Sequence, residues 1–131
     1  MTDKQKELER NAEQVKDSVI CDIEELLDKY LQGKDDIYEY GLSFDYVAPG
    51  TFRDQREGYW RYQIAWGGPA YEIRFYGPGA DWKPVDVSFV YLDWFVGHEI
   101  ALEGHDREVA QRLWDEYLEP WAQEKFEEAV R

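Results

Sequence analysis

Apolar residues recur every three or four positions along the first part of the chain. Those that keep this spacing are Leu8, Ala12, Val15, Val19, Ile23, Leu26 and Tyr30. This spacing places the apolar side chains on one face of a helix. Thr2 followed by Gln5 matches a capping box, and Gly33 suits a left-handed residue after a helix end. We therefore predict one long amphipathic helix over residues 3–31.

Between residues 38 and 102 the apolar period changes to two, which is typical of strands. Glycine and proline interrupt this segment at residues 49–50, 67–69 and 77–79. The interruptions predict strands at 42–47, 59–66, 71–76 and 85–95, with a fifth at 99–102. The links between them are too short for crossover helices, so the sheet should be mostly antiparallel.

The end of the chain returns to a helical period. Its apolar positions are Val109, Leu113, Tyr117 and Trp121. Asp106 can cap this helix, and Pro120 predicts a kink or a restart with proline in the first turn. The predicted fold is a single acidic α+β domain over residues 1–131. An antiparallel sheet of four or five strands has its helices packed on one face.

The stretch "YWRYQIAWGGPAYEIRFYG", residues 59–77, predicts a hairpin with two distinct faces. Its apolar face would hold Trp60, Tyr62, Ile64, Trp66, Tyr71, Ile73 and Phe75. The apolar residues of 59–66 and those of 71–76 share a face only if the numbers of paired residues add to an odd total. This requires a loop with an even number of residues. Pro69 cannot donate to the strand ladder, so a four-residue loop is favoured over two.

The same register places Arg61 and Arg74 next to each other or diagonally on the second face. Gln63, Glu72 and Tyr76 share that face. Like charges this close are unfavourable unless carboxylates or aromatic rings lie beside them. The candidate carboxylates are Asp45, Glu57, Asp86 and Asp93. The face is either a salt-bridged, partly solvated surface or a site for an anion or a partner.

Asp93 stands inside "VSFVYLDWFVG", residues 87–97, which is apolar on both faces. Such a strand is typical of the centre of a sheet or of one covered on both sides. A buried carboxylate needs a partner, and a raised pKa would suit a general acid. Asp93 is therefore either a structural carboxylate or part of a site with Arg61, Arg74 and Tyr76.

Charge limits the partners of this chain. Its 131 residues include 29 acidic and 15 basic side chains, giving a net charge of -14, while 44% of the residues are hydrophobic. The hydrophobic content predicts a folded chain, and the charge disfavours direct binding to nucleic acid or anionic membranes. The same field attracts a basic protein surface.

Seven carboxylates near the C-terminus are candidates for a continuous negative, partner-binding surface: Glu108, Asp115, Glu116, Glu119, Glu124, Glu127 and Glu128. Such a surface could imitate the phosphate array of DNA and occupy the basic groove of a nucleic-acid-binding protein. The alternative is that these charges serve only solubility.

Catalytic and metal motifs are weak in this sequence. Cys21 is the single cysteine, the serines lack a nucleophile elbow, and the start of the chain is too charged for a signal peptide. The cluster of His98, Glu99, Glu103, His105 and Asp106 matches no compact metal-ligand spacing. We predict a cytoplasmic, non-enzymatic protein that needs no metal or cofactor.

The runs "LSFDYVAPGTF", "YWRYQIAWGGPAYEIRFY" and "VYLDWFVG" resemble a family of small proteins of bacterial plasmids, prophages and integrative elements, often called plasmid-related. The resemblance covers about residues 41–97 and brings no assigned activity. It implies a bacterial cytosol and an accessory role, and it favours an anti-defence function.

The leading hypothesis is an acidic binding protein that acts as a DNA-mimic-like inhibitor or modulator of a basic nucleic-acid-binding protein. The alternative is a small-ligand-binding or enzymatic domain that uses Arg61, Arg74, Tyr76 and Asp93. A homodimer is possible, and an uncovered aromatic sheet face would suggest one.

Overall fold

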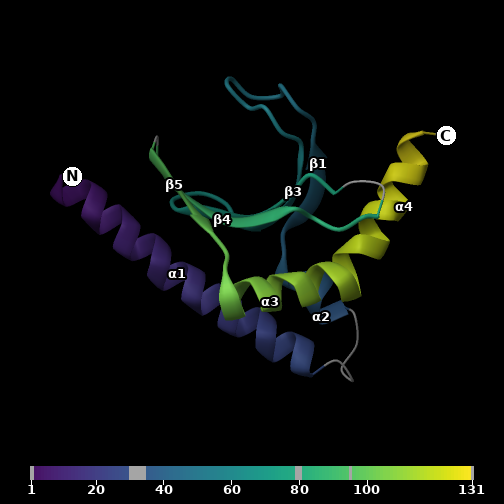
Figure 1. Ribbon diagram of the computed structural model, residues 1–131. Coiled ribbons are helices and arrows are strands. Elements are labelled where there is room, and N and C mark those ends of the chain that lie inside the picture. The colour runs from purple at the N-terminus through teal and green to yellow at the C-terminus, as the bar shows by residue number, and fades with distance from the viewer. Residues whose placement is uncertain (1, 30–34, 79–80, 95, 131) are drawn as a thin grey trace.

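The computed structural model describes residues 2–29, 35–78, 81–94 and 96–130. The helices are α1 (Asp3–Asp28), α2 (Asp35–Tyr40), α3 (Gly104–Leu113) and α4 (Glu119–Ala129), and a π-helical turn, η2 (Trp114–Leu118), joins the last two. The strands are β1 (Ser43–Val47), β2 (Tyr59–Ala65), β3 (Ala70–Tyr76), β4 (Asp86–Asp93) and β5 (Val96–Ala101). Figure 1 shows the resulting α+β arrangement, which confirms the predicted fold class.

The five strands form one antiparallel sheet in the order β1-β2-β3-β4-β5. In the β2–β3 hairpin Arg61 lies opposite Arg74, so paired numbers give the predicted odd total. The register shifts between Gln63 and Ala65, which marks a bulge. Trp66 was expected on the apolar face, but β2 ends at Ala65 and Trp66 is 67% exposed.

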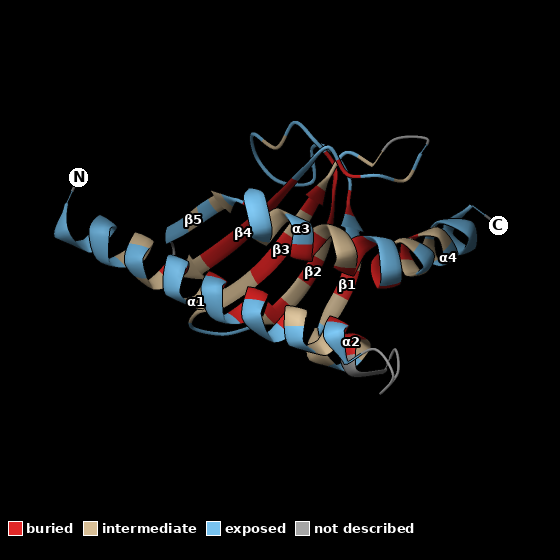
Figure 2. Ribbon diagram, turned by 60° about the horizontal axis from the view of Figure 1, so that its bottom comes forward, coloured by how far each residue is buried: buried red, intermediate tan, exposed pale blue. Residues whose placement is uncertain are grey.

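The helices cover one face of the sheet, as Figure 2 shows from the helical side. One cross-strand row on that face consists of Phe44, Tyr62, Ile73 and Phe89, all buried. Above the sheet Trp114 is fully buried, with its ring centroid 5.1 Å from that of Phe75. Its indole N–H donates to the carbonyl of Trp82 at 2.6 Å. This aromatic layer forms the core between the helices and the sheet.

The turn before Pro120 explains how a proline fits a continuous helical region. Pro120 lies in the first turn of α4, as predicted. Proline has no N–H to donate, and its ring clashes with the carbonyl four residues earlier, which here belongs to Glu116. The wider π-helical turn η2 accommodates both effects, and the chain changes direction between α3 and α4 (Figure 1).

The ends of the helices differ in part from the prediction. The capping box of Thr2 and Gln5 is confirmed by both of its hydrogen bonds. α1 ends at Asp28, and the prediction for Gly33 lies outside the described residues. The short helix α2 was missed because six residues are too few to establish a helical period.

Asp106 was expected to cap the final helix, but the cap position is Glu103, which makes no side-chain cap bond. Asp106 lies in the first turn instead, and its carboxylate accepts a hydrogen bond from Lys16 at 2.7 Å. This contact joins α3 to α1 over a separation of 90 residues.

Lys16 is a buried cation, only 8% exposed. Its Nζ also lies 2.9 Å from Asp17 and 3.3 Å from Glu13. Burial alone lowers the pKa of Lys16, but the hydrogen bonds that its ammonium donates to the three carboxylates more than reverse this, and the net pKa is raised. Lys16 therefore stays charged and holds the two helices together.

We expect Lys16→Met to lower the free energy of unfolding by about 2 kcal/mol, because it leaves three carboxylates without their shared cation. Urea unfolding followed by circular dichroism measures the loss. Lys6→Met is the matched control on the exposed start of α1 and should change stability by less than about 0.5 kcal/mol. Equal losses in the two variants would contradict a structural role for Lys16.

His105 forms a second contact between the same helices, with its Nε2 2.9 Å from Glu24. The hydrogen bond and the charge of Glu24 raise the pKa of His105 above 6.5. The folded chain therefore holds this proton more tightly than the unfolded chain does. The contact contributes its full stability below pH 6.5, and this contribution is lost as the pH rises through the pKa of His105 in the folded state.

We expect Glu24→Gln to lower the His105 pKa toward its ordinary value, as followed by proton NMR of the imidazole ring. Glu25→Gln removes the same charge from the neighbouring exposed position and should leave that pKa nearly unchanged. A His105 pKa that responds equally to both variants would show that only the general field acts on it.

Candidate binding site on the open sheet face

The sheet face opposite the helices carries a row of paired residues that crosses all five strands and is polar on four of them, which we call the polar row. Its members are Asp45, Arg61, Arg74, Ser88 and Ala101. The two arginines lie side by side in the middle of the row, as the alternation of the hairpin predicted. We call this side the open face.

Arg61 is held by Asp45, one of the predicted carboxylates. The guanidinium donates two hydrogen bonds, from Nε to Oδ1 at 3.1 Å and from Nη2 to Oδ2 at 2.7 Å. These hydrogen bonds are the main reason that the pKa of Arg61 is raised. Such a two-point contact fixes the plane of the guanidinium as well as neutralising it.

Arg74 is held by two carboxylates and an aromatic ring. Its Nε donates to Glu72 at 2.8 Å, and its Nη1 lies 3.9 Å from Glu99. The guanidinium also lies over the ring of Tyr59, 4.6 Å from its centroid. Burial lowers the pKa of Arg74, but the hydrogen bond with Glu72 helps to reverse this and the net pKa is raised. Both arginines are therefore already neutralised within the chain.

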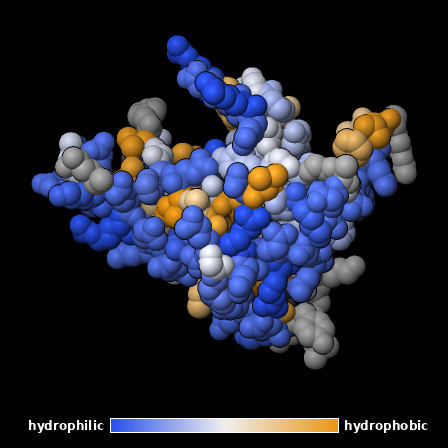
Figure 3. Space-filling view, viewed as in Figure 1, coloured by the Kyte–Doolittle hydropathy of each residue, from blue (hydrophilic) through white to orange (hydrophobic). Residues whose placement is uncertain are grey.

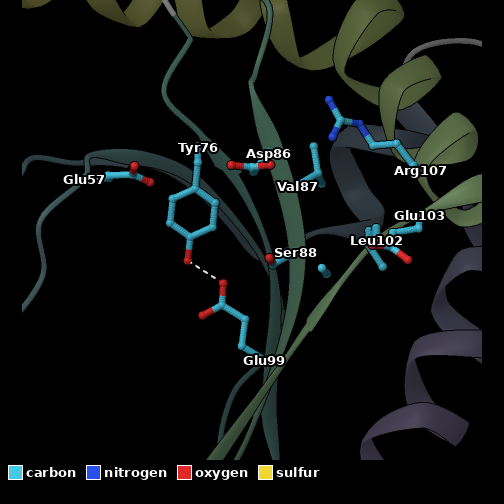
Figure 4. Close-up of a pocket in the computed structure, with 10 residues that line it drawn as sticks. Glu57, Tyr76, Asp86, Val87, Ser88, Glu99, Leu102, Glu103 and Arg107 are labelled. Atoms are coloured by element: carbon cyan, nitrogen blue, oxygen red, sulfur yellow. Dashed lines mark hydrogen bonds between the residues drawn. The ribbon is translucent and has the colours of Figure 1, made fainter.

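Tyr76 and Glu99 connect β3 to β5 across the intervening strand. The Tyr76 hydroxyl donates to Glu99 Oε2 at 2.6 Å (Figure 4). Burial and this hydrogen bond raise the pKa of Tyr76 to about 12. The hydroxyl is thus protonated at neutral pH and remains a donor to the carboxylate.

Two adjoining hollows form a groove along the open face, and Glu57, Tyr76 and Glu99 line both of them. The hollow at the β4–β5 side has a volume of about 620 Å³, and the hollow beside the link between β1 and β2 about 530 Å³. Four carboxylates and one guanidinium line the first, which we call the Ser88 pocket: Glu57, Asp86, Glu99, Glu103 and Arg107. The pocket is therefore strongly negative.

Asp93 does not join the arginines. It ends β4 opposite Val96, and its position in the strand alternation places it on the helical side of the sheet. There it lines a separate hollow beside the start of α1, together with Trp94 and Leu8. Only Arg61, Arg74 and Tyr76 of the predicted ligand face are brought together.

The seven C-terminal carboxylates are divided by cations. Lys83 lies 2.8 Å from Asp115 and 3.2 Å from Glu119. Glu116 lies 3.9 Å from Arg112, and Glu108 lies 4.0 Å from His105. Within the described ranges no ion pair is found for the exposed carboxylates Glu124, Glu127 and Glu128 on α4.

Sequence reasoning missed two of the carboxylates that hold Arg74. Glu72 was placed on the correct face, and its position two residues before Arg74 on the same strand was the available signal. Glu99 gave no such signal, because its contact depends on how β5 pairs with β4. In the described part of the chain, no group of three or more metal-ligand side chains is gathered, and no helix is long and apolar enough to cross a membrane.

The two arginine contacts should differ in strength, because the Glu72 side chain is 6% exposed and that of Asp45 is 45% exposed. We expect Glu72→Gln to lower the free energy of unfolding by about 2 kcal/mol, since it leaves Arg74 without its buried counter-charge. Asp45→Asn is the matched control and should cost less than about 1 kcal/mol. Urea unfolding of both variants measures the difference, and a larger loss in the Asp45 variant would contradict this order.

Comparisons of the chain with protein-family models, with curated proteins and with solved structures found no match. The resemblance of residues 41–97 to plasmid-related proteins stays a prediction. The chemistry of the open face must therefore be inferred from its own residues.

Proposed function

We propose that the chain is a non-enzymatic binding protein whose groove on the open face receives a basic protein partner. One observation carries this proposal: four carboxylates and one guanidinium line the Ser88 pocket, whereas the adjoining hollow also carries Arg53, Arg56 and Arg74. Arg61 and Arg74 are engaged by Asp45, Glu72 and Glu99. For Glu57, Asp86 and Glu103 no ion pair is found among the described residues. The Ser88 pocket is therefore the part of the groove that offers an excess of negative charge.

The rest of the molecule reinforces the field of the groove. The net charge of -14 draws a basic surface toward the chain and raises the rate of encounter. The side of the molecule seen in Figure 3 is mostly hydrophilic, and its apolar side chains gather only in small patches. This surface favours an interface dominated by charge over one dominated by apolar burial.

A nucleic-acid-binding protein is the class of partner that this surface suits best. Such a protein carries lysines and arginines arranged to neutralise phosphates, and an acidic groove competes for the same side chains. Inhibition or modulation of that protein would follow from the competition. The accessory, anti-defence role implied by the resemblance to plasmid-related proteins agrees with this function.

The alternative of a catalytic or small-ligand site receives less support. That hypothesis requires Asp93 to converge with Arg61 and Arg74, and Asp93 lies on the helical side. An anion would also have to displace the carboxylates that already hold the arginines. The row of arginines and carboxylates on the open face differs from the bare aromatic face that would suggest a homodimer.

The immobilised chain is first used to capture a partner from a lysate of the cells in which the chain naturally occurs. Binding between the purified chain and the purified partner is then measured by calorimetry. We expect the dissociation constant to rise about tenfold or more between 50 and 300 mM salt, because the attraction is screened. The double variant Glu57→Gln, Asp86→Asn should weaken binding by a similar factor of about ten, at about 1.4 kcal/mol per tenfold.

The matched control is Glu127→Gln, Glu128→Gln, which removes the same charge from α4 and should leave affinity within about twofold. Binding that is indifferent to salt would contradict the proposed function. Loss of affinity only in the α4 variant would move the contact from the groove to the C-terminal carboxylates.

A further inference from the structure

We propose that the Ser88 pocket binds the ammonium group of a lysine side chain from the partner. This inference rests on the proposed function and states which chemical group the groove recognises. It depends on a buried hydroxyl and on the acceptors around it.

Ser88 is 6% exposed and lies between Arg74 and Ala101 in the polar row. Among the described residues, the Ser88 hydroxyl has no hydrogen-bond partner. No side-chain polar atom of the described chain is both sealed from solvent and unpaired, so this oxygen must reach the pocket. Figure 4 shows the hydroxyl directed toward the Tyr76–Glu99 pair. A buried polar group that opens only onto a pocket is available to a ligand.

The pocket supplies negative charge next to this hydroxyl. Glu99 accepts one hydrogen bond from Tyr76, and its other oxygen is 3.9 Å from Arg74, which leaves it room to accept another donor. The one guanidinium of the pocket, Arg107, is held elsewhere. It donates to the backbone carbonyls of Pro84 at 3.2 Å and Val85 at 3.4 Å. Among the described residues, Arg107 therefore forms no ion pair with the pocket carboxylates, and its single charge leaves the pocket negative.

The position of the acceptors on different strands favours lysine over arginine. An ammonium is a compact charge with three donors that can meet a hydroxyl and a carboxylate on different strands, whereas a guanidinium prefers a planar two-point contact. Val87 and Leu102 also line the pocket, but they are only 2% and 4% exposed, so the preference for lysine rests on the charge and on the geometry of its donors.

The test is a titration of the ¹⁵N-labelled chain with three capped tripeptides, Gly-Lys-Gly, its Nε-acetyl-lysine form and Gly-Arg-Gly, followed by amide chemical shifts. We expect the lysine peptide to shift the amides of Ser88, Glu99 and Ala101. The acetylated peptide should cause no such shifts, because it lacks the charge. The arginine peptide should bind at least about threefold more weakly than the lysine peptide.

Ser88→Ala should weaken the lysine peptide about threefold or more, through the loss of one acceptor, and Glu99→Gln about tenfold. Glu127→Gln, outside the pocket, should bind as the unaltered chain does. Near-ultraviolet circular dichroism confirms that each variant retains its packed aromatic core, and Ser88→Thr, which keeps a hydroxyl, should retain more affinity than Ser88→Ala.

Equal shifts with the acetylated peptide, or an affinity that Ser88→Ala leaves unchanged, would overturn the lysine pocket. If the basic partner still binds in a salt-dependent way under those outcomes, the proposed function stands and only the pocket is wrong. If the partner binds without regard to salt while the lysine peptide still occupies the pocket, the proposed function fails and the pocket remains.

Discussion

The fold depends on the burial of Trp114 between the helical layer and the sheet. Its ring packs on Phe44 and Phe75, and its indole N–H reaches the backbone of the link between β3 and β4 through the carbonyl of Trp82. A tryptophan buries more apolar area than any other side chain, and its one polar atom must be paired when buried. This requirement ties η2 to one face of the sheet. The opposite face is then left for charge.

The faces of the hairpin could be predicted from sequence because strand alternation has an exact period of two. Once Trp60, Tyr62, Ile73 and Phe75 are assigned to the core, Arg61 and Arg74 must lie together on the other side, and they do. Asp45 could be proposed as a partner on the same grounds. Parity also explains why Asp93 fails to join them, since it is an odd-numbered residue on a strand whose open-face positions are even.

Other features of the site could not be predicted, because they depend on contacts between elements that are distant in sequence. The role of Glu99 follows from the register of β5, which is fixed by tertiary packing and by a connection of only a few residues. Likewise, the sequence alone predicts that the acidic residues of the last helices form one continuous surface. In the structure, Lys83 lies between Asp115 and Glu119, although it belongs to a loop about thirty residues earlier in the chain.

The strand order has a consequence for how the chain reaches this structure. Because every strand pairs with its neighbour in sequence, the sheet can form hairpin by hairpin, and each step closes a short loop at small entropic cost. The helical layer is different, since the Lys16–Asp106 contact joins residues 90 positions apart and encloses the whole sheet between them. An assembly that begins with local pairing would therefore form the open face first, and the Lys16–Asp106 contact between α1 and α3 would follow once the last strand is in place.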